Sequence, residues 1–279
     1  MVRSILNKYR IKGGTFDQHF LVETSYLDRI VAAADLNPEE TVLEIGAGIG
    51  NLTERLARKA KKVIAIELDP ALVHVLHDRF DAVENIEIIA GDALKLDFPE
   101  FDKVVSNLPY SISSEITFKL LRHRFSLGIL MYQYEFAKRM VSPPDCKDYS
   151  RLTVDTYYFA DASILMKVPK GAFQPAPEVD SAVIKLVPRP APFEVKDEAF
   201  FMDFVAGVFS QRRKKLRNAI LNTNYMLGIP EVKEVVNQLP EDFMGKRAEN
   251  LTPEQLAEVA NMIVDLKSGS RGSKQDSEA

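Results

Sequence analysis

Short apolar runs alternate with amphipathic segments along the first half of the chain. Residues 41–45 form a β-favouring run that ends at a group of glycines. In the segment 51–60, Leu52, Leu56 and Ala60 recur every four residues between charged positions, which predicts an amphipathic helix. The alternation continues with expected strands at 62–66, 86–90 and 102–106 and an expected helix at 70–80. Strands separated by helices of this length predict right-handed βαβ units and a mostly parallel sheet covered on both faces.

The second half of the chain begins with the same pattern and then becomes helical. Residues 125–131 predict another strand, 135–141 a helix, and the β-rich runs 162–168 and 181–187 an antiparallel edge pair. The segment 188–192 holds three prolines in five residues, so it cannot continue a helix or a central strand, and we place a domain boundary there.

Beyond that boundary the sequence predicts helices and then a tail. Thr252, Pro253 and Gln255 form a capping box with proline at the first helical position, in front of an apolar stripe. We therefore expect an α/β domain over 1–189 and a small helical domain over 193–267. The remaining segment, 268–279, is small and polar, and we expect it to be disordered.

Composition limits the class of protein. The chain has 279 residues with 46% hydrophobic and 27% charged content, which is typical of globular proteins. Its longest apolar run, 125–132, is far too short to cross a bilayer, and the N-terminus lacks the apolar core of a signal peptide. The single cysteine, Cys146, cannot form an internal disulfide. These features predict a soluble, cytoplasmic protein.

The glycine-rich segment 44–50 lies between an expected strand and an expected helix and predicts a cofactor site. Its spacing is G-x-G-x-G, and Glu44 stands two positions before Gly46. A carboxylate there would repel a pyrophosphate but attract an ammonium group, so S-adenosylmethionine fits better than a dinucleotide. Glu67 ends the second strand, where an acidic side chain can accept hydrogen bonds from ribose hydroxyls. Asp92 follows the third strand and is placed to accept from the adenine amino group.

The motif Asn107-Leu108-Pro109-Tyr110 follows the fourth strand and predicts amine methylation. The N6 amine of adenine is a poor nucleophile because its lone pair is delocalised into the ring. The Asn107 amide oxygen and the Leu108 carbonyl can accept the N6 hydrogens and so localise that lone pair. Pro109 stiffens the loop, and Tyr110 can stack on a base that has left its own stack. Phe173 either clamps the opposite face of that base or is a buried loop residue.

A basic run interrupts an otherwise acidic chain. The chain carries 36 basic and 40 acidic residues, a net charge of −4, which argues against a generally cationic surface. The run nevertheless places five cations in six positions, and no acidic residue lies between Asp203 and Glu231. It is either a solvated helix face or a phosphate-binding patch for RNA. Its cations are Arg212, Arg213, Lys214, Lys215 and Arg217.

From about Phe16 to Leu266 the chain resembles the ribosomal RNA adenine N6,N6-dimethyltransferase family. Besides the motifs above, the resemblance is carried by Gln18-His19-Phe20-Leu21, by 173–181 and by 209–214. Residues 130–140 resemble the archaeal and eukaryotic branch. Asp17 departs from the family, in which many members have glycine.

The resemblance implies a Rossmann-like class I methyltransferase fold and a helical RNA-binding domain after it. It implies that two adjacent adenines near the 3′ end of small-subunit rRNA are dimethylated, within a pre-ribosomal particle. It also implies that one group of side chains lines the cofactor site: His19, Leu21, Gly46, Glu67, Asp92 and Asn107. In the family, the N-terminal motif forms a lid that closes over the cofactor. Because Asp17 replaces the usual glycine, the resemblance does not determine the shape of this lid here.

Two other functions remain open at the level of sequence. One is methylation of a single adenine in large-subunit rRNA, and the other is a ribosome-assembly factor that acts mainly by binding RNA. We expect no metal site, because four scattered histidines and one cysteine do not make a ligand cluster. We expect a monomer that uses S-adenosylmethionine.

Overall fold

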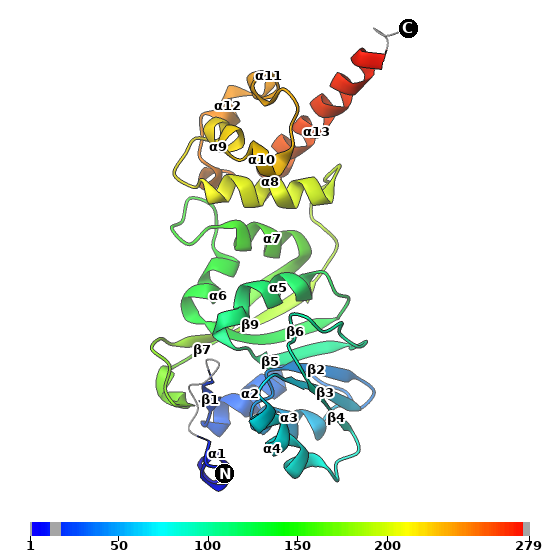
Figure 1. Ribbon diagram of the computed structural model, residues 1–279. Coiled ribbons are helices and arrows are strands. Elements are labelled where there is room, and N and C mark those ends of the chain that lie inside the picture. The colour runs from blue at the N-terminus through cyan, green and yellow to red at the C-terminus, as the bar shows by residue number, and fades with distance from the viewer. Residues whose placement is uncertain (1, 12–17, 276–279) are drawn as a thin grey trace. The chain divides into compact units, whose positions relative to one another are not determined.

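The computed structural model describes residues 2–11 and 18–275. The described chain forms two compact units: residues up to 138 together with 160–189, and residues 139–159 together with those from 190 onwards. The first unit is an α/β domain, and the second is helical (Figure 1).

The first unit is built on a sheet of seven strands in the order β4-β3-β2-β5-β6-β9-β7. The first five strands of that order are parallel, whereas β9 pairs antiparallel with both β6 and β7. The chain moves outwards from β2 to β4 and then returns to place β5 on the other side of β2. Ligands of open α/β sheets bind at such a change of direction, outside the carboxyl ends of the strands. The strands are β2 Thr41–Ile45, β3 Lys62–Glu67, β4 Ile86–Ala90, β5 Lys103–Asn107, β6 Leu127–Gln133, β7 Ala160–Val168 and β9 Ser181–Pro188.

Helices cover both faces of this sheet. Leu27, Leu56 and Phe80, from three consecutive helices, are buried in apolar clusters on one face. On the other face Thr117 Oγ1 lies 2.9 Å from the Tyr132 hydroxyl of β6, and Figure 1 shows α5 across the strands from α2, α3 and α4. The helices of this unit are α1 Val2–Lys8, α2 Thr24–Ala33, α3 Asn51–Ala57, α4 Pro70–Phe80, the 3₁₀ helix η2 Tyr110–Ile112, α5 Ser113–Leu121 and η3 Lys170–Ala172, and α6 Tyr134–Val141 continues into the second unit.

A second, two-stranded sheet joins the N-terminal segment to the loop before β9. Strand β1, Phe20–Leu21, pairs antiparallel with β8, Phe173–Gln174. The pairing sets Leu21 opposite Phe173 and places both side chains in the apolar cluster under α2 and α3. Residues 18–21 are thereby held beside the carboxyl ends of the parallel strands.

The second unit is an all-helical bundle with its own core. Phe201, Phe204, Leu256 and Ile263 are buried at its centre. The reciprocal capping box predicted for α13 is present, since Gln255 N donates to Thr252 Oγ1 and Thr252 N donates to Gln255 Oε1. Its helices are α7 Arg151–Phe159, α8 Glu198–Ser210, α9 Leu216–Asn222, α10 Asn224–Leu227, α11 Val232–Gln238, α12 Glu241–Met244, η4 Ala248–Asn250 and α13 Pro253–Gln275.

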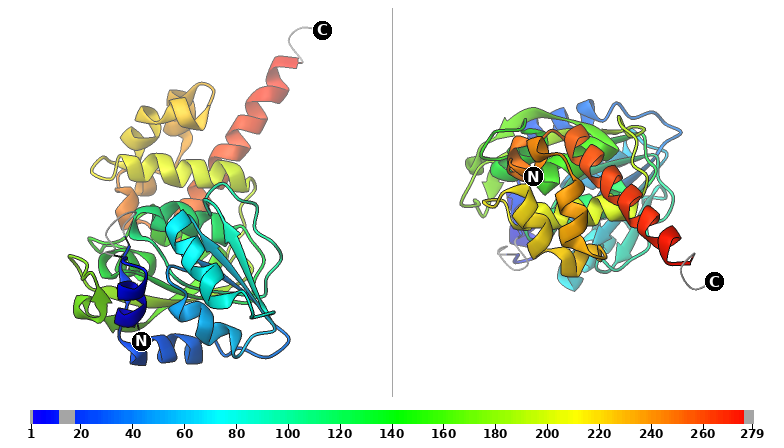
Figure 2. Two further views of the ribbon diagram at one scale, coloured as in Figure 1. Left: turned by 60° about the horizontal axis from the view of Figure 1, so that its bottom comes forward. Right: turned by 90° about the horizontal axis from the view of Figure 1, so that it is seen from above.

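Two boundaries differ from the sequence-based expectation. Residues 139–159 were expected in the first domain, but Tyr149, Val154 and Tyr158 are buried in the core of the helical unit. The segment 268–279 was expected to be disordered, but α13 continues to Gln275 and extends beyond the other helices of its unit (Figure 2). A helix that has nucleated on a packed stretch adds one hydrogen bond for each further residue, so small polar residues can continue it. Residues 276–279 lie outside the described part.

Candidate active site

A cavity lies at the carboxyl ends of β2, β3, β4 and β5, and it gathers the residues expected to bind the cofactor. Glu44 and the glycine loop form one side, and the motif after β5 forms another. All of the expected cofactor residues line it: His19, Leu21, Gly46, Glu67, Asp92 and Asn107. The cavity is therefore at the position that the strand order favours for a ligand.

Gly46 begins the loop between β2 and α3 in a conformation that suits only glycine. Its φ is +74°, and a Cβ at this position would lie 3.0 Å from Cδ of Pro109. The Gly46 and Ala47 amides both donate to the Ile66 carbonyl, at 2.8 and 3.1 Å. The loop is thus fixed to the end of β3, and its backbone faces the cavity without a side chain in between.

Glu44 is a buried carboxyl group with an unused acceptor. It is 2% exposed, and its Oε2 has no hydrogen-bond partner among the described residues. Burial, with a smaller contribution from the charge of Glu67, raises the pKa of Glu44 to about 8. A cationic ligand would supply the missing partner and would favour the ionised form. The electrostatic preference expected from the sequence is therefore accompanied by an unsatisfied acceptor in the cavity wall.

Glu67 supports the glycine loop as well as lining the cavity. Its Oε2 accepts from Gly48 N at 2.7 Å, and its Oε1 accepts from Leu68 N and Asp69 N at 2.9 Å each. Burial raises the pKa of Glu67, and these backbone hydrogen bonds oppose the shift. The loop-supporting part of this role was not apparent from the sequence.

Asp92 is held in place by its own turn. Its Oδ1 accepts from Leu94 N at 2.9 Å, and Lys95 Nζ lies 3.6 Å from Oδ2. Asp92 is partly exposed and lines the cavity next to Gly91. A carboxylate fixed in this way presents acceptors at the end of β4.

The turn after β5 orients Asn107 with its acceptor available. Asn107 Nδ2 donates to the His19 carbonyl at 3.3 Å. A carbonyl can only accept, so the amide nitrogen must face it, and the Oδ1 atom keeps its capacity to accept a hydrogen bond from a ligand. Leu108 N donates to Met131 O at 3.3 Å, which ties the turn to β6. Asn107, Leu108, Pro109 and Tyr110 all line the cavity.

Tyr110 is positioned by residues that are distant in sequence. Its hydroxyl lies 2.6 Å from Ser181 Oγ, and its ring lies 5.7 Å from the ring of His19 at an interplanar angle of 29°. His19 Nδ1 in turn donates to the Pro175 carbonyl at 2.9 Å. The sequence analysis did not predict these contacts.

The N-terminal segment is attached to the cavity at more than one point. Gln18 Nε2 donates to Asp69 Oδ2 at 2.8 Å, and Asp69 also caps α4. Together with the β1–β8 pairing, this contact holds residues 18–21 beside the cavity. Asp17 lies outside the described residues, so its effect on this segment stays a prediction.

Phe173 is not brought into the cavity. Its side chain is 4% exposed and belongs to the apolar cluster that contains Leu21 and Val183. The pairing of β8 with β1 directs it into that core. Of the two readings left open by the sequence, the structure therefore has the buried residue and not the base clamp.

Four of the five cations of the basic run, Arg212 to Lys215, lie in a turn between α8 and α9, and Arg217 lies on α9, so the run does not form one helix face. Lys215 forms an isolated antiparallel bridge with Arg247, and Leu216 N donates to the Lys246 carbonyl at 2.7 Å. The extended geometry of such a bridge is incompatible with a helix through Lys215. Leu216 and Ile220 are buried and anchor α9.

Two of the five cations in that run are paired. Arg212 Nε lies 2.6 Å from Glu249 Oε2, and Arg217 NH2 lies 2.7 Å from Glu241 Oε2. Arg213, Lys214 and Lys215 are exposed, and we call these three the exposed basic turn. The bridge also brings two further exposed cations beside it, Lys246 and Arg247, which the sequence analysis missed because they are about 30 residues away.

The described residues contain no group of three or more His, Cys, Asp or Glu side chains that could hold a metal ion. None of the helices in 2–11 and 18–275 is both long and apolar enough to cross a membrane.

Sequence comparison relates this chain to a family of RNA-modifying enzymes. The family described as ribosomal RNA adenine dimethylase matches residues 10–264. A protein of Methanosarcina acetivorans named "Probable ribosomal RNA small subunit methyltransferase A" is 85% identical over 268 residues, which cover 96% of this chain and 100% of that protein. A protein of the same name from Methanococcoides burtonii is 63% identical over 270 residues, covering 97% and 100%.

Solved structures agree with this relationship. A dimethyladenosine transferase from Plasmodium falciparum superposes with a TM-score of 0.77 at 33% identity, covering 90% of this chain and 98% of that one. The 23S rRNA methyltransferase ErmE gives a TM-score of 0.64 at 27% identity, covering 88% and 99%. These likenesses confirm the expected class I methyltransferase fold. The family match and the high identity to its members together show that this chain belongs to the ribosomal RNA adenine dimethylase family.

Proposed function

We propose that the protein is an S-adenosylmethionine-dependent rRNA adenine N6,N6-dimethyltransferase. Its substrate would be two adjacent adenines in the 3′-terminal hairpin of small-subunit rRNA. The observation that carries the proposal is a single cavity that contains both Glu44 with its unpaired Oε2 and the turn that presents Asn107 Oδ1. The names of the archaeal relatives, and that of the Plasmodium falciparum structure, support the same substrate class.

The polar groups of the cavity suit S-adenosylmethionine. Glu44 would hold the ammonium group, Glu67 the ribose hydroxyls and Asp92 the adenine amino group. Gly46 lets Pro109 pack directly against the loop, and a Cβ there would lie 3.0 Å from Pro109 Cδ. When bound, S-adenosylmethionine supplies a methyl group on a sulfonium, which is an electrophile that needs only a positioned nucleophile.

The turn after β5 would prepare that nucleophile. Asn107 Oδ1 and the Leu108 carbonyl accept the two N6 hydrogens, which favours a pyramidal nitrogen with its lone pair towards the methyl group. Tyr110, held by Ser181, stacks on the adenine after it leaves its helix. No strong base is required, because the nitrogen becomes acidic on methylation and its proton can leave to water. A second round converts methyladenine to dimethyladenine.

The helical unit would bind the RNA. Its exposed basic turn, Arg213 to Lys215, together with Lys246 and Arg247, forms a local cationic surface on a chain whose net charge is −4. Exposed cations of this kind contact the phosphates of RNA. Such contacts increase the affinity and position the RNA, but they do not recognise its base sequence. We propose that the protein acts as a monomer in the cytoplasm, on an immature small subunit.

The alternative of large-subunit methylation has less support. The ErmE structure, a 23S rRNA methyltransferase, is less similar in both TM-score and identity than the dimethyladenosine transferase. The relatives with identities of 63% and above carry small-subunit names.

One experiment tests the substrate directly. Purified protein is incubated with methyl-labelled S-adenosylmethionine and either unmethylated small subunits or large subunits, and the RNA is digested to nucleosides. Label in N6,N6-dimethyladenosine from small-subunit RNA is the expected result. Label only in large-subunit RNA would refute the substrate assignment.

A matched variant separates catalysis from binding. Asn107→Ala is expected to bind small subunits but to transfer little methyl. If immature subunits still mature with this variant, the assembly role rests on binding and exists beside the catalytic one. If the parent protein binds but never transfers methyl to either subunit, the enzymatic proposal is wrong.

A further inference from the structure

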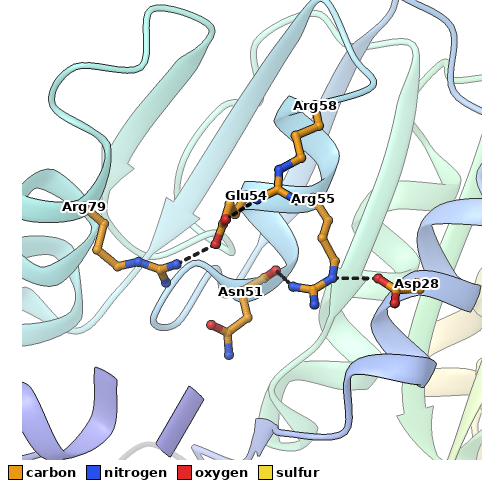
Figure 3. Close-up of polar contacts among 6 residues, drawn as sticks. All are labelled: Asp28, Asn51, Glu54, Arg55, Arg58 and Arg79. Carbon is orange, nitrogen blue, oxygen red and sulfur yellow. Dashed lines mark hydrogen bonds and ion pairs between the residues drawn. The ribbon is translucent and has the colours of Figure 1, made fainter. Parts of the chain in front are cut away.

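Arg79 is a mostly buried cation at the end of α4 that contacts the glycine loop. Its side chain is 11% exposed. The NH1 group donates to the Ile49 carbonyl, and NH2 donates to Glu54 Oε2 at 2.9 Å. Figure 3 shows the guanidinium reaching from α4 to Glu54 on α3. One side chain therefore connects the loop backbone, the helix after it and α4.

The loop needs such an external contact because of its sequence. Ile49 stands between Gly48 and Gly50, whose φ angles are +60° and +80°. Glycines reach these angles without strain, but they also lose more conformational freedom than other residues when they are ordered. A hydrogen bond to the carbonyl between them restricts this backbone before any ligand arrives. Ile49 itself lines the cavity.

The next residue of α4 supports the same loop by packing. A Cβ on Gly50 would lie 2.4 Å from Cε2 of Phe80, so the Phe80 ring lies directly against the Gly50 backbone. The Arg79 guanidinium in turn lies 4.9 Å from the centroid of that ring. The last turn of α4 thus holds Ile49 by a hydrogen bond and Gly50 by van der Waals contact.

Arginine has the geometry that this position requires. Its planar guanidinium presents separate N–H donors to two acceptors on different elements. The ammonium of a lysine is a single compact group on a flexible side chain and would not reach both acceptors at once. Glu54 is also bound on its outer side by Arg58, which is 68% exposed. The Arg58 contact secures Glu54 but does not reach the loop (Figure 3).

A second arginine, Arg55, contacts the residue that directly follows the loop. Arg55 NH1 donates to the Asn51 carbonyl at 3.0 Å, and Arg55 Nε lies 2.8 Å from Asp28 Oδ1 on α2 (Figure 3). Asn51 also lines the cavity. Arg79 of α4 therefore holds the loop at Ile49, and Arg55 holds Asn51, the first residue of its own helix α3.

We propose that Arg79 is a positioning residue of the cofactor site, which sets the Gly48–Asn51 backbone in its binding conformation without touching the ligand. This role rests on the cofactor assignment of the proposed function. Preorganisation lowers the ordering cost at the moment of binding, so it is expressed as cofactor affinity. RNA affinity, which we assign to the helical unit, does not depend on it.

The test compares Arg79→Lys with Arg58→Lys as the matched control. Calorimetry with S-adenosylhomocysteine is expected to give about tenfold weaker binding for Arg79→Lys, equivalent to ~1.4 kcal/mol, and parental binding for Arg58→Lys. In steady-state assays the KM for S-adenosylmethionine rises while kcat and the KM for RNA stay near parental values. In the ligand-free protein, amide hydrogen exchange of residues 48–51 becomes faster in Arg79→Lys only.

The possible results distinguish a failure of the Arg79 role from a failure of the cofactor assignment. If the parent binds S-adenosylhomocysteine and Arg79→Lys binds it equally well, the positioning role is wrong and the proposed function is unaffected. If the parent itself does not bind the ligand, the cofactor assignment fails, and the role of Arg79 fails with it. If Arg79→Lys does not fold, Glu54→Gln serves instead, because it weakens the hold on Arg79 and should reduce affinity about threefold. Parental affinity in Glu54→Gln would then refute the proposal.

Discussion

The buried carboxyl group of Glu44 predicts a pH dependence of cofactor binding. Burial raises its pKa from 4.5 to about 8, so at pH 7 roughly one ligand-free molecule in ten carries the charge. The ionised form is the one that attracts an ammonium group. Cofactor binding should therefore release a proton from Glu44 at neutral pH.

The magnitude follows from this pKa. Between pH 6 and pH 8 the affinity should rise by up to about tenfold per pH unit, or ~1.4 kcal/mol. The reason is that the free energy needed to ionise the Glu44 carboxyl group falls by this amount with each pH unit. Above about pH 8 the α-amino group of the ligand loses its own proton, since such groups titrate near 7.7–8.0. The affinity should therefore be greatest close to pH 8.

Calorimetry in buffers of different ionisation enthalpy measures both quantities. The parent should release close to one proton per ligand at pH 6.5, and Glu44→Gln should release almost none and have a nearly flat profile below pH 7.5. Glu39→Gln, which alters an exposed carboxyl group outside the cavity, is the matched control and should behave as the parent does. A parent whose affinity is constant from pH 6 to 8 without proton release would refute the reasoning.

The same group has a consequence for the stability of the ligand-free protein. Because the folded-state pKa is raised, the unfolded chain releases this proton first, and the contribution of Glu44 to stability falls as the pH rises from about 4.5 to about 8. The fall is at most ~5 kcal/mol. Denaturant titrations of the parent and of Glu44→Gln should therefore diverge in this range, with the parent losing more stability towards pH 8.

Three further predictions concern the other parts of the site. Glu67→Gln should weaken cofactor binding by about 1.5–3 kcal/mol, measured by calorimetry, and unchanged affinity would remove Glu67 from the ribose site. Asn107→Ala should lower the single-turnover methyl-transfer rate about 100-fold with little change in RNA affinity, and a normal rate with poor RNA binding would make it a docking residue. Alanine at the three positions of the exposed basic turn should make the negative slope of log affinity against log salt shallower by about 2–3. Arg217→Ala should change this slope little. An unchanged slope in the triple variant would place the RNA surface elsewhere.

The sheet of the first unit was largely predictable, and its central strands β2, β3, β5 and β6 are buried on both faces. Such strands are short continuous apolar runs between glycines and helices, and the bounds of β2, α4 and β4 agree with the prediction. Helix α3 ends at Ala57, three residues before the predicted end. The amides of Lys59 and Ala60 both donate to the Leu56 carbonyl there, and this tight turn leads into β3.

Helix α7 shows where local preference fails. Residues 151–159 contain Thr, Val and Tyr, which favour strands, and the sequence analysis assigned no helix to them. In the folded protein Leu152, Val154 and Tyr158 are buried, and Val154 and Tyr158 lie in the core of the helical unit. Burial in that core outweighs the differences in intrinsic propensity, which are only fractions of a kcal/mol per residue. The segment was assigned to the wrong unit for the same reason.

The residues that line the cavity could be predicted to lie together, but the contacts that support them could not. Glu44, Gly46 and Glu67 lie at strand ends, and consecutive parallel strands bring their carboxyl ends to one edge of the sheet. The contacts that orient the other groups join distant segments: His19 to Pro175, and Tyr110 to Ser181. Neither hydrophobic periodicity nor spacing encodes such pairs, because they depend on how the final loops cross the sheet.

The basic run is a second case in which contacts between distant residues could not be predicted from the sequence, and here these contacts affect RNA binding. Along the sequence its five cations are far from any acidic residue, but in the fold Arg212 and Arg217 each meet a carboxylate more than 20 residues away. An arginine that is already paired must exchange that partner for a phosphate, so it contributes little to the free energy of RNA binding. In the described part of the chain, no carboxylate pairs with the three residues of the exposed basic turn, so they have no partner to exchange. The bridge from Lys215 to Arg247 also brings the exposed Lys246 beside this turn, whereas Arg247 itself lies 3.6 Å from Glu249 Oε1. The cations that can meet RNA phosphates therefore depend on the tertiary structure and not on the linear run alone.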